Sequence, residues 1–298
     1  MVVATGFFDG VHLGHRLVIR KLVEMAKNAG DESLVVTFWP HPRNVLQKDA
    51  RQLRLLTSLS EKKRMLGELG VDRVEVLPFT REFSRMTTLE YLRDVVVGRF
   101  GARSIVLGYD NRMGNDATDA DFVEKTAISL GLEVVRMDNL RFTDQVAISS
   151  TKIRDRLQEG DVVQANQMLG YNYSLCGVVV GGHRLGRTLG YPTANMQLYE
   201  PLKLIPARGV YFVKVNTLGR EFFGMCNIGC RPTLGEGKER TIETHIFDFD
   251  EDIYGLDIEV SFLSKIRDEV RFSTLEELKC QLSRDKEVCL EEKLKINN

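Results

Sequence analysis

The sequence predicts an α/β fold in two parts: a domain with a parallel sheet, followed by a small antiparallel β-barrel and a terminal helix. Up to about residue 148, short β-branched runs alternate with segments whose apolar residues recur every three or four positions. This pattern is typical of strands and helices that alternate along the chain. From residue 173 onward, strand-like runs follow one another between glycines and polar turns, as in small barrels.

In the first part, the β-branched runs predict five strands, at Val2–Thr5, Leu34–Phe38, Val74–Leu77, Ile105–Leu107 and Val134–Met137. The periodic segments between them predict helices at Leu17–Ala29, Glu61–Leu69, Leu89–Phe100 and Asp119–Leu130. In a parallel sheet covered by helices, ligands bind beyond the carboxyl ends of the strands. We therefore expect functional residues in the loops that follow the strands.

The pattern changes after Ile148, where two short helices are expected at Ser150–Gln158 and Val162–Leu169. Strand-like runs then predict a barrel, at Leu175–Val180, Gly209–Val215, Glu221–Ile228, Thr241–Phe247 and Ile258–Leu263. A last amphipathic helix is expected at Thr274–Leu294, with Ser273 as its N-cap. We place the boundary so that the domains comprise residues 1–170 and 171–298.

Length and charge exclude several classes of protein. The 298 residues suit two domains. A formal net charge of -1 offers no broad surface for nucleic acid or for an anionic membrane, and there is no long apolar stretch and no basic leader. Five scattered cysteines indicate a reducing compartment. We expect a cytoplasmic monomer or weak homo-oligomer that acts on small molecules.

Residues 6–15 read GFFDGVHLGH and directly follow the first predicted strand. Their glycines allow the backbone to turn tightly and to approach a ligand closely. His12 and His15 are three residues apart, which places both on one face where a helix begins. Helix N-termini bind phosphate, and two imidazoles there can stabilise charge on phosphorus. The alternative is a glycine-rich turn with two solvated histidines.

Residues 148–154 read ISSTKIR and include the start of a predicted helix. Their hydroxyls, backbone amides and two cationic side chains can bind a triphosphate there. Alone, this segment is equally a capping sequence. Together, H-x-G-H and ISSTxxR resemble the signatures of the nucleotidyltransferase superfamily, whose members bind ATP and transfer AMP. The resemblance implies a Rossmann-like domain, with His12 and His15 as catalytic residues. It implies an ATP site made of Gly6, Phe7, Asp9, Gly14, Gly108, Ser150, Thr151 and Arg154.

Two more segments, TFWPHPR at 37–43 and LGYDNRMG at 107–114, resemble elements of bacterial FAD synthetases. The resemblance implies that they shape the FMN and adenine sites, through Phe38, Pro40, His41 and Asp110. Without it, the P-H-P element is equally a rigid loop with a capping histidine. The sequence departs from the family pattern at Phe7, Asn111 and Met113, which leaves the flavin contacts open.

Residues 177–195 read GVVVGGHRLGRTLGYPTAN and resemble the kinase domain of the same family. The resemblance implies that the antiparallel barrel has six strands. Glycines in such a loop can wrap amides around phosphates. The resemblance implies an ATP site with Mg²⁺ held by Thr193 and Asn195, whose neutral oxygens suit this hard ion. The other implied ATP-binding residues are Gly181, Gly186 and Arg187. From its residue type alone, Arg187 is equally consistent with a solvent-exposed surface charge.

The segments NIGCRPT at 227–233 and IETHIFDFDEDIYG at 242–255 match the same kinase domain. The resemblance implies that Glu243 is the catalytic base for the ribityl hydroxyl. It also implies flavin contacts from Asn227, Arg231, Arg267 and Glu269. The acidic run at 248–252 lacks EF-hand spacing, and we interpret it as a solvated turn.

The resemblance extends over nearly the whole chain, which is similar to bacterial bifunctional riboflavin kinase/FMN adenylyltransferases. It implies that riboflavin is phosphorylated to FMN and that FMN is adenylylated to FAD, with ATP as co-substrate and Mg²⁺ as cofactor. H-x-G-H and ISSTxxR do not name the acceptor, so another adenylyl- or cytidylyltransferase is an alternative. A non-catalytic flavin or nucleotide sensor is a second one. Composition and periodicity alone indicate only an α/β domain and a β domain.

Overall fold

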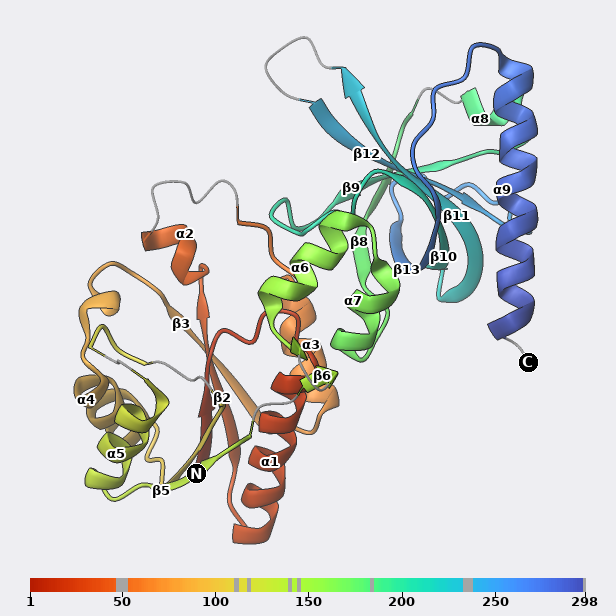
Figure 1. Cartoon of the computed structure of the whole chain (residues 1–298). Helices are drawn as coiled ribbons and strands as arrows, with labels where there is room; N and C mark the ends of the chain where they lie inside the picture. Colours follow the sequence, from red (N-terminus) through yellow and green to blue (C-terminus); the bar gives the residue numbers. More distant parts are fainter. Residues whose placement is uncertain are drawn as a thin grey trace. The chain divides into compact units, whose positions relative to one another are not determined.

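The computed structural model describes residues 1–46, 53–109, 113–116, 119–138, 141–143, 146–182, 185–232 and 238–296. The chain divides into two compact units, Met1–Ser150 and Thr151–Asn298, which are coloured along the sequence in Figure 1. This division groups residues 151–170 with the second unit, whereas we predict them in the first domain. The domain boundary between residues 170 and 171 stays a prediction.

The first unit is built on five parallel strands in the order β3-β2-β1-β4-β5. The strands are β1 Val2–Thr5, β2 Ser33–Trp39, β3 Arg73–Pro78, β4 Ser104–Leu107 and β5 Glu133–Arg136. All five lie where the sequence predicts strands. The central strand β1 is buried along its whole length, because helices cover both faces of the sheet.

The helices of this unit are α1 Leu13–Ala29, α2 Pro42–Leu46, α3 Leu59–Glu68, α4 Thr88–Glu90 and α5 Ala120–Ser129. A 3-10 turn, η2 Phe83–Arg85, precedes α4, and a π-helix, η3 Tyr91–Arg99, continues it. A short hairpin joins β6 Arg141–Thr143 to β7 Val146–Ala147. Figure 1 shows α1 on one side of the sheet and α4 and α5 on the other.

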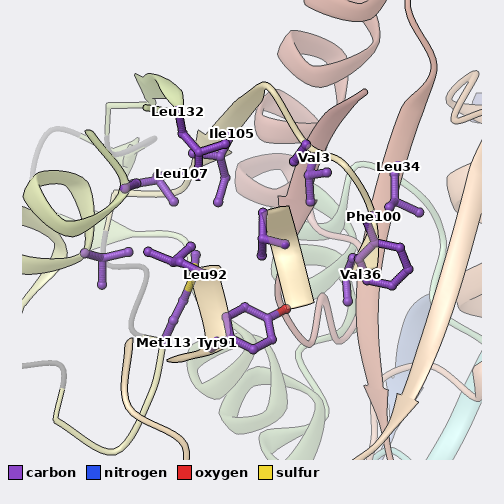
Figure 2. Close-up of a cluster of buried hydrophobic side chains, with 14 of the residues drawn as sticks. Val3, Leu34, Val36, Tyr91, Leu92, Phe100, Ile105, Leu107, Met113 and Leu132 are labelled. Atoms are coloured by element: carbon purple, nitrogen blue, oxygen red, sulfur yellow. The ribbon is translucent and has the colours of Figure 1, made fainter. Parts of the chain in front are cut away.

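The core under η3 and α5 is formed by alternate strand residues that point to the same face of the sheet (Figure 2). Val3, Leu34 and Ile105, from three adjacent strands, are completely buried there. Tyr91 and Leu92 from η3 pack against them. The opposite face receives the apolar stripe of α1, which comprises Val18, Ile19, Leu22, Val23 and Ala26.

The second unit contains a closed antiparallel barrel in the strand order β10-β11-β12-β9-β8-β13. Its strands are β8 Ser174–Val180, β9 Ala194–Leu198, β10 Gly209–Thr217, β11 Arg220–Pro232, β12 Lys238–Ile246 and β13 Asp257–Arg267. Helices α6 Ser150–Glu159 and α7 Val162–Leu169 precede it, and α8 Leu185–Thr188 interrupts it. The predicted six-stranded barrel is confirmed. Strand β9 is not among the five strand ranges that the sequence predicts, because the polar residues Asn195 and Gln197 interrupt any apolar pattern there.

The terminal helix α9 Leu275–Ile296 lies along the outside of the barrel (Figure 1). Arg267, at the end of β13, donates to Asp285 on α9 from Nε (2.9 Å) and Nη2 (2.7 Å). Asp285 is almost fully buried, and Gln281 donates to it as well (2.9 Å). A bidentate pair of this kind fixes both the position and the rotation of the helix.

The N-cap of α9 is Thr274 and not the predicted Ser273. The Thr274 hydroxyl accepts from the Glu277 amide (3.2 Å), while the Ser273 amide donates to the Glu277 carboxylate (3.0 Å). Both residues have suitable side chains, but the helix begins at Leu275. Only the hydroxyl immediately before it reaches the third amide of the helix.

The Asp285→Ala substitution should lower the free energy of unfolding of the second unit by about 2–4 kcal/mol. It leaves the Arg267 guanidinium, about one-fifth exposed, without its carboxylate. Urea unfolding followed by circular dichroism, fitted with one transition for each unit, measures the change. The matched control is Asp268→Ala, because Asp268 pairs with Lys265 at an exposed position. It should cost less than about 1 kcal/mol, and an equal cost for both variants would contradict the assigned role of Asp285.

Candidate active sites

The turn after β1 has an unusual backbone. Phe8, Gly10 and Val11 have φ angles of 50°, 81° and 36°, in the left-handed region that favours glycine. A β-branched residue such as Val11 adopts this conformation only where surrounding contacts impose it. The turn lies beyond the carboxyl end of the central strand, where a parallel sheet binds its ligand.

His12 and His15 lie together at the N-terminus of α1. Their rings are stacked, with centroids 3.6 Å apart and planes 19° apart. His12 Nδ1 accepts from the His15 amide (3.3 Å) and so caps the helix. A Cβ on Gly14 would lie 3.2 Å from the His12 ring, so the glycine leaves space for this arrangement. The two predicted catalytic histidines are therefore brought together where the helix dipole favours phosphate.

His15 is held in its neutral form at neutral pH. Burial lowers its pKa well below the ordinary value, and the nearby charges of His12 and Lys62 act in the same direction. Its Nδ1 atom is buried and has no hydrogen-bond partner within the described residues. A neutral imidazole keeps one N–H group, which can donate a hydrogen bond to a phosphate oxygen.

Asp9 is buried and bonded to the segment that precedes α3. Its carboxylate accepts from the amides of Leu56 (3.1 Å) and Thr57 (3.0 Å). The Thr57 hydroxyl in turn accepts from the Gly10 amide (3.0 Å). The Asp9 carbonyl accepts from the Ser150 hydroxyl (2.9 Å). Asp9 thus connects the two sequence motifs of this site, and its predicted contact with ATP stays a prediction.

The other predicted ATP residues are placed as follows. Gly6 lies against the Phe8 ring, and a Cβ there would be 3.2 Å from it. Gly108 follows the last residue of β4. Thr151 and Arg154 lie on the first turns of α6, in the other compact unit. Their contacts with ATP stay predictions.

Lys62 is a charged residue of this site that sequence reasoning missed. Its side chain is completely buried, and its Nζ donates to the Phe7 carbonyl (2.7 Å). The same Nζ lies 3.7 Å from the centroid of the Phe7 ring. A signal was present in the sequence, because Lys62 shares the helix face of the buried residues Met65 and Leu66.

An aromatic pocket lies beside the turn. Its volume is about 460 Å³, and its aromatic lining comprises Phe7, Phe38, Phe79, Phe83 and Tyr91. Phe38, a predicted FMN residue, lies 5.5 Å from Phe83, and His41 lies 3.9 Å from Phe7, between ring centroids. Pro40, another predicted FMN residue, lies between Phe38 and His41 in the sequence. Asp110 and Asn111 lie outside the described residues.

Met113, one of the departures from the family pattern, also lines this pocket. Its carbonyl accepts from the Thr88 hydroxyl (2.5 Å), which fixes the loop against α4. At Gly114 (φ 83°) a Cβ would lie 2.3 Å from the Thr88 amide, so only glycine permits this approach. Methionine thus replaces an aromatic side chain without removing an apolar wall. Sequence reasoning missed Phe79, Phe83 and Tyr91, which lie far from the quoted motifs.

In the barrel, strand register brings three predicted residues side by side. Glu243 on β12 is paired with Asn195 on β9 and with Asn227 on β11. Directly paired residues on adjacent strands point to the same face. The predicted base therefore lies between a predicted metal ligand and a predicted flavin contact.

The predicted phosphate loop, which contains Gly181, Gly182 and Gly186, contacts the row of paired residues Asn195, Glu243 and Asn227. A Cβ on Gly182 would lie 2.2 Å from the side-chain nitrogen of Asn195 (Nδ2). A Cβ on Gly186 would lie 2.2 Å from the backbone carbonyl oxygen of Tyr191. Gly181 has open space around it. Arg187 and Thr193 line a pocket of about 300 Å³. Residues 183 and 184 lie outside the described part of the chain.

His245 positions the P-T-A-N segment, a role that sequence reasoning missed. Its Nδ1 lies 2.8 Å from the Pro192 carbonyl, to which the ring N–H donates. Burial lowers the pKa of His245, so the ring is neutral at neutral pH and keeps one donor and one acceptor. Tyr191 packs edge-on against it, and its hydroxyl bonds Ser283 on α9 (2.8 Å).

The predicted flavin contacts of the barrel are only partly brought together. Glu269 and Asn227 both approach Gly229, where a Cβ would lie 3.0 and 3.2 Å from their side chains. Arg267 is instead bonded to Asp285 on α9. The side chain of Arg231 lies outside the described part of the chain. Its flavin contact and that of Arg267 stay predictions.

Comparison with known proteins assigns the family. The FAD synthetase model matches residues 1–152, and the riboflavin kinase model matches residues 169–292. A bifunctional riboflavin kinase/FMN adenylyltransferase of Listeria monocytogenes is 36% identical, over 96% of this chain and 90% of the relative. The chain belongs to this bifunctional family. A member from Escherichia coli is 37% identical over 95% of this chain and 90% of its own length.

The predicted family, with its two transferase domains, is thereby confirmed. A crystal structure from Streptococcus pneumoniae, described as a macrolide-efflux protein, matches 97% of this chain and 93% of its own. It has a TM-score of 0.88 and is 32% identical. Its description differs from the names of the sequence relatives, and the two family models decide the family here. No helix in the described part of this chain is long and apolar enough to cross a membrane.

Gly182→Ala should strongly reduce phosphorylation of riboflavin, the reaction for which the kinase family is named. The added methyl group would displace Asn195 from the row with Glu243. Misplacing such a group by about 1 Å costs on the order of 10²-fold in rate. FMN formation measured by chromatography is the readout. The matched control is Gly181→Ala, which meets no neighbouring atom and should retain most activity. Equal activity of the two variants would contradict the assigned packing.

Proposed function

We propose that this chain makes FAD from riboflavin in two steps, each of which consumes one ATP. The barrel phosphorylates riboflavin to FMN, and the parallel-sheet unit adenylylates FMN. The observation that carries the proposal is the row Asn195–Glu243–Asn227, because it places a carboxylate between groups suited to a metal–nucleotide and to a flavin. The matching family models support both halves.

In the kinase step, Glu243 accepts the proton of the 5′-hydroxyl of riboflavin. The hydroxyl oxygen then attacks the γ-phosphate of ATP, and ADP leaves. Thr193 and Asn195 fit a magnesium ion, because both offer neutral oxygens and Gly182 keeps the space beside Asn195 free of a Cβ. Mg²⁺ bound there would neutralise charge on the transferred phosphate. Positioning supplies much of the remaining acceleration.

In the adenylyl transfer step, a phosphate oxygen of FMN attacks the α-phosphate of ATP, and pyrophosphate leaves. His12 and His15 stabilise charge at the α-phosphate, at the N-terminus of α1. The aromatic pocket beside them has the apolar walls that a flavin ring requires. No covalent intermediate on the enzyme is needed.

The setting of the reaction is also part of the proposal. The near-neutral charge and the five cysteines support a cytoplasmic protein that acts on small molecules, as a monomer or weak homo-oligomer. We place the two catalytic domains at residues 1–170 and 171–298. The FAD synthetase match ends at residue 152, and the riboflavin kinase match begins at residue 169.

Chromatography of riboflavin incubated with ATP, magnesium and the protein tests the whole proposal. FMN should form first and FAD should follow. Formation of FMN alone would contradict the adenylyltransferase half, and formation of FAD only from supplied FMN would contradict the kinase half.

The Glu243→Ala substitution should reduce FMN formation by about 10²- to 10⁴-fold, because it removes the general base. Adenylylation of supplied FMN should be unchanged, since Glu243 belongs to the other compact unit. Both activities are measured on the same preparation. Equal loss of the two would refute this division of labour.

A further inference from the structure

Lys62 lies at a place where a charge is costly. It is on the buried face of α3, completely removed from solvent, and lysines are almost never fully buried without specific partners. An apolar residue at this position would pack against Met65 and Leu66 without any desolvation cost. The chain nevertheless has an ammonium group here, so its contacts call for an explanation.

The ammonium group is directed at the backbone of Phe7. Nζ donates to the Phe7 carbonyl (2.7 Å) and lies over the Phe7 ring, 3.7 Å from its centroid. Thr37 on β2 donates to the same carbonyl (3.2 Å). Two donors to the carbonyl and a cation–π contact with the ring thus converge on one residue, Phe7.

Phe7 immediately precedes the left-handed turn. Phe8 and Val11 have positive φ angles, and His12 follows at the N-terminus of α1. Asp9, within the turn, is bonded to the amides of Leu56 and Thr57. One segment, residues 56–62, therefore binds the turn twice: through backbone amides at Asp9 and through an ammonium group at Phe7. A strained turn keeps its shape only if it is held in this way.

We infer that Lys62 is a positioning residue for adenylyl transfer, which acts through Phe7 to hold the turn and the two histidines in place for the ATP phosphates. The inference rests on the proposed function of this site. Lys62 is assigned no contact with substrate. Its positive charge also adds to the potential that attracts polyphosphate.

The charge of Lys62 makes the role measurable. Burial lowers the pKa of its ammonium to about 8, and the negative charge of Asp9 opposes this. The charge of Lys62 also acts on His15 of α1, whose pKa is well below its ordinary value. Lysine loses its charge as the pH rises through its pKa, whereas His15 titrates at lower pH. Lys62 should therefore give adenylyl transfer an alkaline limb.

The test uses the full chain with Lys62→Met, and with Lys63→Met at the exposed neighbouring position as the matched control. FAD formation from FMN, ATP and magnesium is measured from about pH 6.5 to 9.5. In Lys62→Met, kcat should fall by about tenfold or more and the alkaline limb near pH 8 should disappear. Lys63→Met should behave as wild type. Riboflavin phosphorylation, measured on the same preparations, should be unchanged in both.

A Lys62→Met protein with the wild-type rate would overturn the inference. So would a reduced rate that retains the alkaline limb, because that result assigns Lys62 a structural role alone. If Lys62→Met does not fold, Thr37→Val decides, since it removes the second donor to the Phe7 carbonyl together with the hydroxyl that accepts from Lys62 Nζ (3.5 Å). Thr37→Val should lower kcat for FAD formation and leave riboflavin phosphorylation unchanged. An unchanged kcat for FAD formation would overturn the inference. Absence of FAD formation in the wild type would instead refute the proposed function itself.

Discussion

The buried carboxylate of Asp9 is the contact on which the first site depends. It accepts from two consecutive amides before α3, and its own carbonyl accepts from Ser150. These bonds join three segments that are far apart in the sequence. They also hold a turn in which a valine has a left-handed backbone. Without a buried acceptor, the Leu56 and Thr57 amides would lack a partner, and the turn would relax to a commoner conformation.

The second site depends on strand register instead. Asn195, Glu243 and Asn227 are neighbours because β9, β12 and β11 pair in one register. A shift by one residue would turn Glu243 to the opposite face of the barrel. The outer supports are α9 and His245, which hold Tyr191 and Pro192 just before β9. The two units therefore position their predicted catalytic groups by different means, a hydrogen-bonded turn in one and a closed sheet in the other.

Much of this arrangement could be predicted from the sequence, because the informative signals are local. Short β-branched runs located the five parallel strands, and the motifs located His12, His15 and Glu243. Strand β9 was missed because polar residues, Asn195 and Gln197, interrupt any apolar pattern in its short sequence. Lys62 was missed because a lysine on a helix is ordinarily solvated, and its burial follows only from the packing of α3 against the turn. Ser273 and Thr274 are chemically similar, and only the backbone decides which of them caps α9.

The position of Trp39 has an optical consequence. It is the single tryptophan of the chain and the last residue of β2, next to Phe38 of the aromatic pocket. The barrel unit contains tyrosines and phenylalanines but no tryptophan. Tryptophan emission therefore reports on the parallel-sheet unit alone, and the two halves of the molecule are spectroscopically distinct without any label.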